Sequence, residues 1–465
     1  MTYEENTREQ LKSMAFGYGS REKGTVVPKT KLNRKSIDAK AAKALIVNEL
    51  LDEGRSRLNL ATFCQTYMEP EALELMSETM DKNAIDKSEY PQTAEIEQRC
   101  VKILSNLWHC PKGANAIGTS TVGSSEACML AGMAMKFRWR NNLKDGDTAG
   151  RTPNIVMSEV YQVCWEKFCV YWDVEMRTVP IDEDHLCLNV DKVMDYVDEN
   201  TIGIVGILGT TYTGDYEDIK ALDKKVSEYN RKSGNHNLVI HVDAASGGIY
   251  TPFVDSSYRW DFRLENVVSI STSGHKYGLT FPGVGWIVWK DRKYLPEELI
   301  FEVEYLGGTM PTIAINFSRS ASQIVAQYYN FLRFGRSGYT VIHKQTQEVA
   351  LAVGEAIKEI GIFKMLNSGK GLPIICYTMK ENATYEDGTP VVWNLHDLSS
   401  RLLMHGWQVP TYRLPGKMSD VVVHRIVCRA DLTYNMGENF IRDLKSCIYE
   451  LKTARILCDE EKGQI

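Results

Sequence analysis

The chain has 465 residues, of which 43% are hydrophobic and 25% charged, the ordinary usage of a globular protein with a large core. Acidic and basic residues are interspersed and the net charge is -6, which excludes the basic surface expected for nucleic-acid binding. The polar, acidic start is unlike a secretory signal. No apolar run reaches the ~18–20 residues of a membrane helix.

The eleven cysteines are scattered and contain no C-x-x-C pair. This distribution is typical of reduced, buried thiols in a cytosolic protein, and it offers no spacing that favours a metal site. We therefore predict a cytoplasmic protein without a bound metal.

Residues 1–57 are polar and lysine-rich, and we interpret them as an N-terminal arm. Short amphipathic helices are predicted over 7–16 and 37–53. The arm has too few apolar residues to form a core of its own.

Strands and helices alternate over residues 58–345, which we interpret as the larger domain. Helices are predicted over 93–109, 124–140, 161–171, 190–197 and 219–229, and strands over 154–157, 203–208, 238–242, 267–270 and 286–289. Nearly continuous apolar strands separated by helices indicate an α/β fold with a mostly parallel sheet covered on both faces. Ligands bind such sheets beyond the carboxyl ends of the strands.

A long helix over 341–360 leads into a different pattern. Residues 346–465 are predicted to form a smaller C-terminal α/β domain, with strands over 372–377 and 421–428.

Polar motifs follow several of the predicted strands. Lys276 lies in Ser-Thr-Ser-Gly-His-Lys-Tyr-Gly (271–278), directly after an apolar strand. Most lysines are solvated surface charges, but a lysine with apolar surroundings has a lowered pKa and can form a Schiff base. His275 beside it suits a phosphate or an aromatic ring.

Asp243 lies at the end of another apolar strand, 33 residues before Lys276. An acidic residue at this place is often only a helix cap. A pyridine cofactor, however, needs a carboxylate against its ring nitrogen, and Asp243 fits that role. The small Ala245 would leave space for the ring.

Two further motifs point to the same edge. Ser124 and Ser125 open a buried helix in Gly-Ser-Ser-Glu-Ala, where they could serve as caps or, with the helix N-terminus, bind an anion. Thr211 lies in a Thr/Gly turn (209–214) that follows a strand and is directed toward the same rim.

These motifs together resemble the fold-type I pyridoxal-phosphate enzymes, whose fold is that of aspartate aminotransferase, and within them the group II decarboxylases. Residues 59–66, 83–91 and 315–319 resemble the bacterial glutamate decarboxylases. The resemblance covers residues 45–450. It implies pyridoxal 5'-phosphate as cofactor and conversion of L-glutamate to 4-aminobutyrate and carbon dioxide, which consumes a proton and suggests acid resistance.

The resemblance also implies roles for individual residues. Lys276, Asp243 and His275 would be catalytic. The cofactor would contact Ser124, Ser125, Gln162, Thr211, Asp243, Ala245, Ser273, His275, Lys276 and, from a partner subunit, Ser318. The substrate would contact Thr62, Phe63, Asn83, Asp86, Tyr305 and Arg425.

Without the resemblance, Arg425 would be interpreted as a surface charge at a strand edge.

The resemblance also implies an assembly, a homo-oligomer with a dimer as its minimal unit and a hexamer as the larger form. Two alternatives remain open: another pyridoxal-phosphate amino-acid decarboxylase, and a non-catalytic oligomeric protein of the same fold.

Overall fold

The computed structural model describes residues 29–462 except for gaps at 33–35, 144–147, 149, 234–236, 304–309, 368 and 370. The chain divides into two compact units, Met1–Ser56 and Arg57–Ile465. The first contains α2 (Ala39–Glu49), which Asp38 caps by accepting the backbone N–H groups of Lys40 and Ala41. The helix predicted over 7–16 lies outside the described residues.

Seven strands form the larger sheet, in the order β1-β7-β6-β5-β4-β2-β3. They are β1 (Ile117–Thr121), β2 (Asn154–Ser158), β3 (Glu175–Val179), β4 (Thr201–Ile207), β5 (Ile240–Asp243), β6 (Val267–Ser273) and β7 (Gly285–Trp289). The run from β6 to β3 is parallel, and β7 is antiparallel to both of its neighbours. The predicted α/β fold with a mostly parallel sheet is confirmed.

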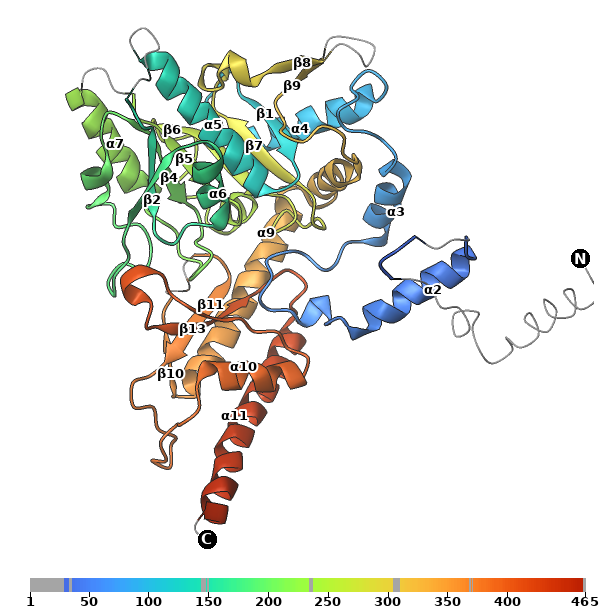
Figure 1. Ribbon diagram of the computed structural model, residues 1–465, viewed down its shortest axis with the longest axis vertical. Helices are drawn as coiled ribbons and strands as arrows, with labels where there is room; N and C mark the ends of the chain where they lie inside the picture. The colour runs from blue at the N-terminus through green and yellow to red at the C-terminus, as the bar shows by residue number, and fades with distance from the viewer. Residues whose placement is uncertain are drawn as a thin grey trace, which may run out of the picture. The chain divides into compact units, whose positions relative to one another are not determined.

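Helices cover both faces of this sheet (Figure 1). They are α3 (Pro70–Thr79), α4 (Pro91–Leu107), α5 (Ser124–Asn142), α6 (Val163–Tyr171), α7 (Ile219–Ser233) and α8 (Thr251–Val254). Neighbouring side chains of β4 alternate between the faces. Ile204 packs in a core with Leu104 of α4 and Leu222 of α7, whereas Val205 packs in another with Trp165 of α6. None of the described helices combines the length and the apolar character needed to cross a bilayer.

The α-helix predicted over 190–197 is wrong. This segment contains only the short 3-10 helix η6 (Val193–Tyr196). Asn189 accepts the backbone N–H of Asp191 at 3.1 Å, and Asp198 accepts that of Asn200 at 2.9 Å. These side chains compete with helical hydrogen bonding at both ends of the segment. The apolar spacing reflects packing, because Val193 is buried in the core.

A smaller antiparallel sheet follows, in the order β10-β11-β13-β12. Its strands are β10 (Phe363–Met365), β11 (Ile374–Met379), β12 (Thr411–Arg413) and β13 (Val422–Val427), and its helices are α10 (Leu395–Met404) and α11 (Tyr434–Lys462). A separate two-stranded sheet consists of β8 (Phe301–Val303) and β9 (Met310–Thr312).

The long helix α9 (Ser322–Glu359) links the two sheets, since it contacts α3 and α4 as well as β10 and β11 (Figure 1). Gly335 interrupts it with non-helical dihedral angles, φ 52° and ψ -164°. Contacts unite residues 57–465 into one compact unit. The division into domains 58–345 and 346–465 therefore stays a prediction.

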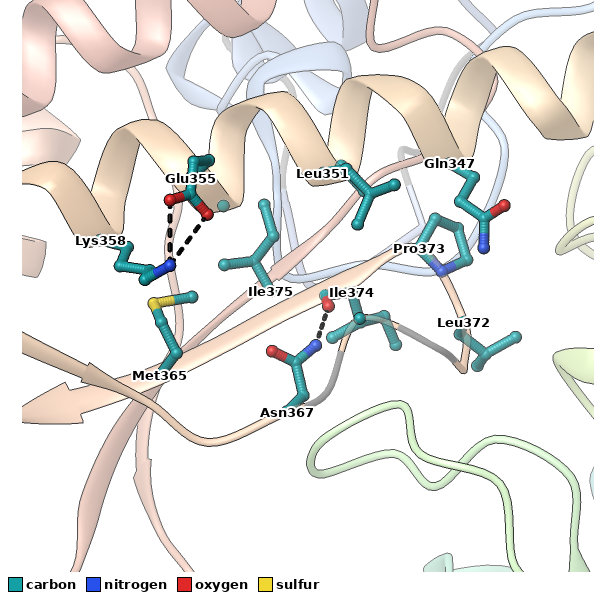
Figure 2. A pocket seen from close by; sticks show the side chains of 13 residues that line it. Gln347, Leu351, Glu355, Lys358, Met365, Asn367, Leu372, Pro373, Ile374 and Ile375 are labelled. Carbon is teal, nitrogen blue, oxygen red and sulfur yellow. Dashed lines mark hydrogen bonds and ion pairs between the residues drawn. The ribbon is translucent and has the colours of Figure 1, made fainter.

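A pocket of about 280 Å³ lies between α9 and β11 (Figure 2). Two of its polar lining side chains, Glu355 and Lys358, pair with each other at 3.0 Å, and Asn367 donates to the carbonyl of Ile374. Because these groups are already paired, we assign no ligand to this pocket.

Candidate active site

Lys276 and Asp243 lie at the carboxyl ends of neighbouring parallel strands. Asp243 is the last residue of β5 and pairs in register with Ser271 of β6, and Lys276 follows β6 by three residues. The Lys276 Nζ atom donates to Ser246 Oγ at 3.2 Å. Burial lowers the pKa of Lys276, although the nearby Asp243 opposes the shift. A lowered pKa increases the fraction of uncharged amine, the form that attacks an aldehyde.

The carboxylate of Asp243 is held by two neutral donors. Its Oδ2 atom accepts the indole N–H of Trp165 at 2.9 Å, and its Oδ1 atom accepts the backbone N–H of Ala245 at 3.1 Å. Asp243 is only 5% exposed, so these bonds fix the direction of a buried acceptor. Trp165 and Ser246 were not predicted as members of this site.

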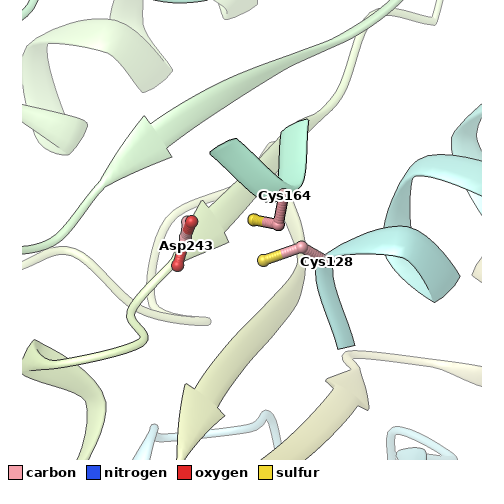
Figure 3. A group of neighbouring side chains, drawn as sticks. All are labelled: Cys128, Cys164 and Asp243. Atoms are coloured by element: carbon pink, nitrogen blue, oxygen red, sulfur yellow. The ribbon is translucent and has the colours of Figure 1, made fainter. Parts of the chain in front are cut away.

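Two thiols flank the same carboxylate (Figure 3). Cys128 comes from α5 and Cys164 from α6, and the Sγ atoms and a carboxylate oxygen of Asp243 all lie within 4.8 Å of one another. Burial raises the pKa of Cys128 well above its ordinary value, which favours the thiol over the metal-binding thiolate. We therefore interpret the cluster as buried packing around Asp243. The predicted absence of a metal stays a prediction.

The N-terminus of α5 forms a cradle for an anion. Within the described residues, neither Ser124 nor Ser125 uses its hydroxyl in a hydrogen bond. Glu126 in the first turn accepts the backbone N–H of Val122, which precedes the N-cap Gly123, at 2.8 Å and does not occupy the first N–H groups of the helix. Both hydroxyls and the first backbone N–H groups of the helix are thus available to a phosphate.

His275 completes this cradle. A Cβ atom at Gly123 would lie 3.1 Å from His275 Cε1, so a larger residue there would push the imidazole away. Burial lowers the pKa of His275 to about 4, which leaves the ring neutral at neutral pH. Its buried Nδ1 atom has no hydrogen-bond partner in the described part of the chain, and neither has the buried Oγ atom of Ser273. Buried polar atoms of this kind are normally satisfied, which fits a phosphate-bearing ligand.

The remaining predicted cofactor residues are placed as follows. Ala245 lies directly after the Asp243 strand, and its carbonyl accepts the N–H of Ser273 at 3.0 Å. Gln162 is the N-cap of α6, where its side chain accepts the N–H of Cys164 at 2.6 Å. Thr211 lies in the turn after β4, and its carbonyl accepts a hydrogen bond from Arg425.

Arg425 is a buried cation, not the surface charge that the strand pattern alone would favour. It lies on β13, an inner strand of the smaller sheet, and is 8% exposed. Its guanidinium donates to the carbonyls of Thr211 and Ala61, each at 2.6 Å, and its Nε atom has no partner among the described residues. The described residues include no carboxylate that pairs with it, whereas the neighbouring Arg429 pairs with Asp431 at 3.1 Å. An unpaired buried guanidinium is suited to bind an anionic ligand.

The Phe63 ring lies close to both Lys276 and Arg425. Lys276 Nζ lies 5.0 Å from the centre of the ring, and Arg425 Cζ lies 4.9 Å from it. The preceding Thr62 accepts the backbone N–H of Cys64 through its hydroxyl at 3.1 Å. The structure thus brings Phe63 and Arg425 together with Lys276.

Other predicted substrate residues are grouped elsewhere. Asn83 donates to Ser318 Oγ at 3.3 Å, and Asp86 accepts the N–H of Glu89 at 3.0 Å. No described contact joins this patch to Lys276. Tyr305 lies outside the described residues.

Comparison with known proteins identifies the family. Residues 33–380 match the pyridoxal-dependent decarboxylase conserved domain. The chain is 57% identical over 465 residues to a probable glutamate decarboxylase gamma of Listeria monocytogenes, covering 99% of this chain and 98% of the relative. It is 55% identical over 463 residues to a glutamate decarboxylase of Lactococcus lactis, with the same coverage of both chains.

A solved glutamate decarboxylase of Lactobacillus brevis superposes with a TM-score of 0.89 at 57% identity, covering 93% of this chain and 97% of that one. A sphingosine-1-phosphate lyase of Burkholderia pseudomallei, at 20% identity and a TM-score of 0.76, shares the fold. With a matching domain over most of its length and relatives above half identity, this chain belongs to the pyridoxal-dependent decarboxylase family.

Proposed function

We propose that the protein decarboxylates L-glutamate to 4-aminobutyrate and carbon dioxide with pyridoxal 5'-phosphate as cofactor. The observation that carries the proposal is the grouping of Lys276 and an oriented Asp243 at the edge of the larger sheet with Arg425 of the smaller sheet, which contacts the same Phe63 ring as Lys276. The high identity to glutamate decarboxylases selects glutamate among the amino acids of this family.

The proposed cofactor site has one part that holds the ring and one part that holds the phosphate. Lys276 binds the cofactor aldehyde, and Asp243 holds a proton on the ring nitrogen. Ser124, Ser125 and His275 bind the phosphate, with Ser318 contributed by a partner subunit. Ser273 completes the phosphate end, and Gln162, Thr211 and Ala245 surround the ring.

When bound, the cofactor withdraws electrons from the bond to the departing carboxylate. Arg425 holds the α-carboxylate and thereby selects which bond of the α-carbon breaks. Thr62 and Phe63 lie beside the distal carboxylate. Asn83 and Asp86 are proposed for the same group by family resemblance, although no described contact joins them to Lys276, and Tyr305 is proposed for a loop over the site. Lys276 is placed to deliver the proton that replaces carbon dioxide on the α-carbon.

The cellular setting is part of the same proposal. We infer a cytoplasmic homo-oligomer, with a dimer as the minimal unit and a hexamer built through residues 1–57. The described cysteines are all free, as expected in a reducing compartment. Because each turnover consumes a proton, the reaction would contribute to acid resistance.

The test is product formation by the purified, cofactor-saturated protein at mildly acidic pH. L-glutamate should give 4-aminobutyrate and carbon dioxide in equal amounts, while L-aspartate and aromatic amino acids should give little. Preference for another amino acid would favour a different decarboxylase. A protein that never develops the visible absorbance of bound cofactor would favour the non-catalytic alternative.

A further inference from the structure

We propose that Trp165 is a positioning residue whose indole N–H orients the Asp243 carboxylate toward the cofactor ring nitrogen and keeps the proton on that nitrogen. The proposal rests on the proposed function, because it assumes that Asp243 meets the ring. It adds a residue that acts through Asp243 without touching the substrate.

The indole is rigidly held. Trp165 lies in the first turn of α6 and is 0% exposed. Its ring meets Phe168 edge-on, with centroids 6.0 Å apart, and lies against His241 at 5.4 Å. Because close packing prevents rotation of the indole, its N–H has one direction, toward Asp243 Oδ2.

The imidazole beneath the indole carries no charge. His241 is held between Ser269 Oγ at 2.8 Å and Ser271 Oγ at 3.1 Å. Burial lowers its pKa to about 4. The Asp243 carboxylate is therefore surrounded on this side by neutral groups, and the described residues give it only Trp165 and Ala245 as direct donors.

This donor set determines where the shared proton resides. Two neutral N–H donors fix the direction of the buried carboxylate, yet leave lone pairs for the ring N–H. Removing the indole donor takes away one of the two hydrogen bonds that fix the direction of the carboxylate, so the carboxylate can rotate away from the ring nitrogen. A misdirected carboxylate holds the proton on that nitrogen less well, which weakens the electron-withdrawing cofactor.

The N-terminal turn of α6 thus contributes two residues to the proposed site. Its N-cap Gln162, which is proposed to face the cofactor ring, bonds the N–H of Cys164. One residue further, Trp165 bonds the carboxylate. A shift of this turn would affect both contacts together.

The experiment uses the full-length, cofactor-loaded protein with Trp165→Phe, which retains an aromatic ring but removes the donor. A second variant carries benzothienylalanine at position 165, which replaces the indole N–H by sulfur and preserves the shape. The matched control is Trp139→Phe. Trp139 is 7% exposed, and its indole N–H has no partner among the described residues.

Both position-165 variants should lower kcat about tenfold while KM for glutamate changes less than about twofold, as expected when one charge-assisted hydrogen bond is lost. The nitrogen-15 signal of ring-labelled cofactor should move toward the unprotonated position. Trp139→Phe should match wild type in both measurements.

Wild-type kcat and nitrogen-15 signal in the benzothienylalanine variant would overturn the proposal, provided that Asp243→Asn is impaired. If Asp243→Asn also behaves as wild type, the assignment of Asp243 itself fails, and the proposed function needs revision. A decrease in thermal stability without a spectral change would mark Trp165 as purely structural and would equally refute the idea.

Discussion

Replacing Arg425 by glutamine removes the cation proposed to hold the α-carboxylate and leaves a shorter polar side chain. In the folded protein the arginine donates to the carbonyls of Ala61 and Thr211 and contacts the Phe63 ring. Glutamine is too short to reach either carbonyl from the same backbone position. The variant leaves no carboxylate stranded, because no described acidic residue pairs with Arg425.

The two expected effects differ in size. Loss of a two-pronged, charge-assisted contact to the substrate costs about 3 kcal/mol, which lowers kcat/KM about 150-fold. Fold stability should change less. The lost carbonyl bonds are offset by removal of an unpaired buried charge, so we expect a net loss of about 1 kcal/mol.

The assay combines initial rates of carbon dioxide release over a glutamate series with urea unfolding. Arg413→Gln on the neighbouring strand β12 is the matched control, since Arg413 is exposed and donates to the carbonyl of Ser419 at 2.9 Å. Its kinetics should match wild type. A folded Arg425→Gln protein with kcat/KM within about twofold of wild type would refute the α-carboxylate role, because even one charged hydrogen bond contributes more.

Lys276→Ala should abolish turnover while the protein stays folded, and borohydride should fix labelled cofactor covalently in wild type only; sustained activity would contradict the attachment. Ser124→Ala and Ser125→Ala should each weaken cofactor binding about tenfold, measured by fluorescence titration, because each removes a hydroxyl donor to a charged phosphate; unchanged binding in the double variant would exclude the cradle. Glu217 is fully buried, and burial raises its pKa from 4.5 to about 8. The folded state therefore binds the proton more tightly, so this residue's stabilising contribution is complete below about pH 4.5 and is lost as the pH rises to about 8. Urea unfolding across this range should show a shallower pH slope in Glu217→Gln, and identical slopes would refute the shift.

The proximity of Asp243 and Lys276 can be predicted from the order of the strands along the chain. Parallel neighbours such as β5 and β6 end at the same edge, so a polar residue after each strand must lie close to the other. This rule is enough to place Asp243 near Lys276. It needs only the strand ends, which apolar runs mark well.

Other features require the three-dimensional packing. Trp165 precedes Asp243 by 78 residues, and an aromatic residue in an apolar helix gives no sign of where its N–H will point. Strand β1 was not predicted because its Gly-Thr-Ser-Thr run is polar. It is buried because Glu97 accepts hydrogen bonds from the backbone N–H and the hydroxyl of Ser120, a partner that sequence spacing does not reveal.

The acceptors that hold Arg425 are both main-chain oxygens. Side-chain replacements at positions 61 and 211 therefore leave the anchor in place as long as the backbone keeps its course. The orientation of this guanidinium is thus insensitive to sequence drift at its own contact points. Insertions or deletions in either segment would displace the carbonyls and misdirect the guanidinium, so this anchor should withstand substitution there but not a change of length.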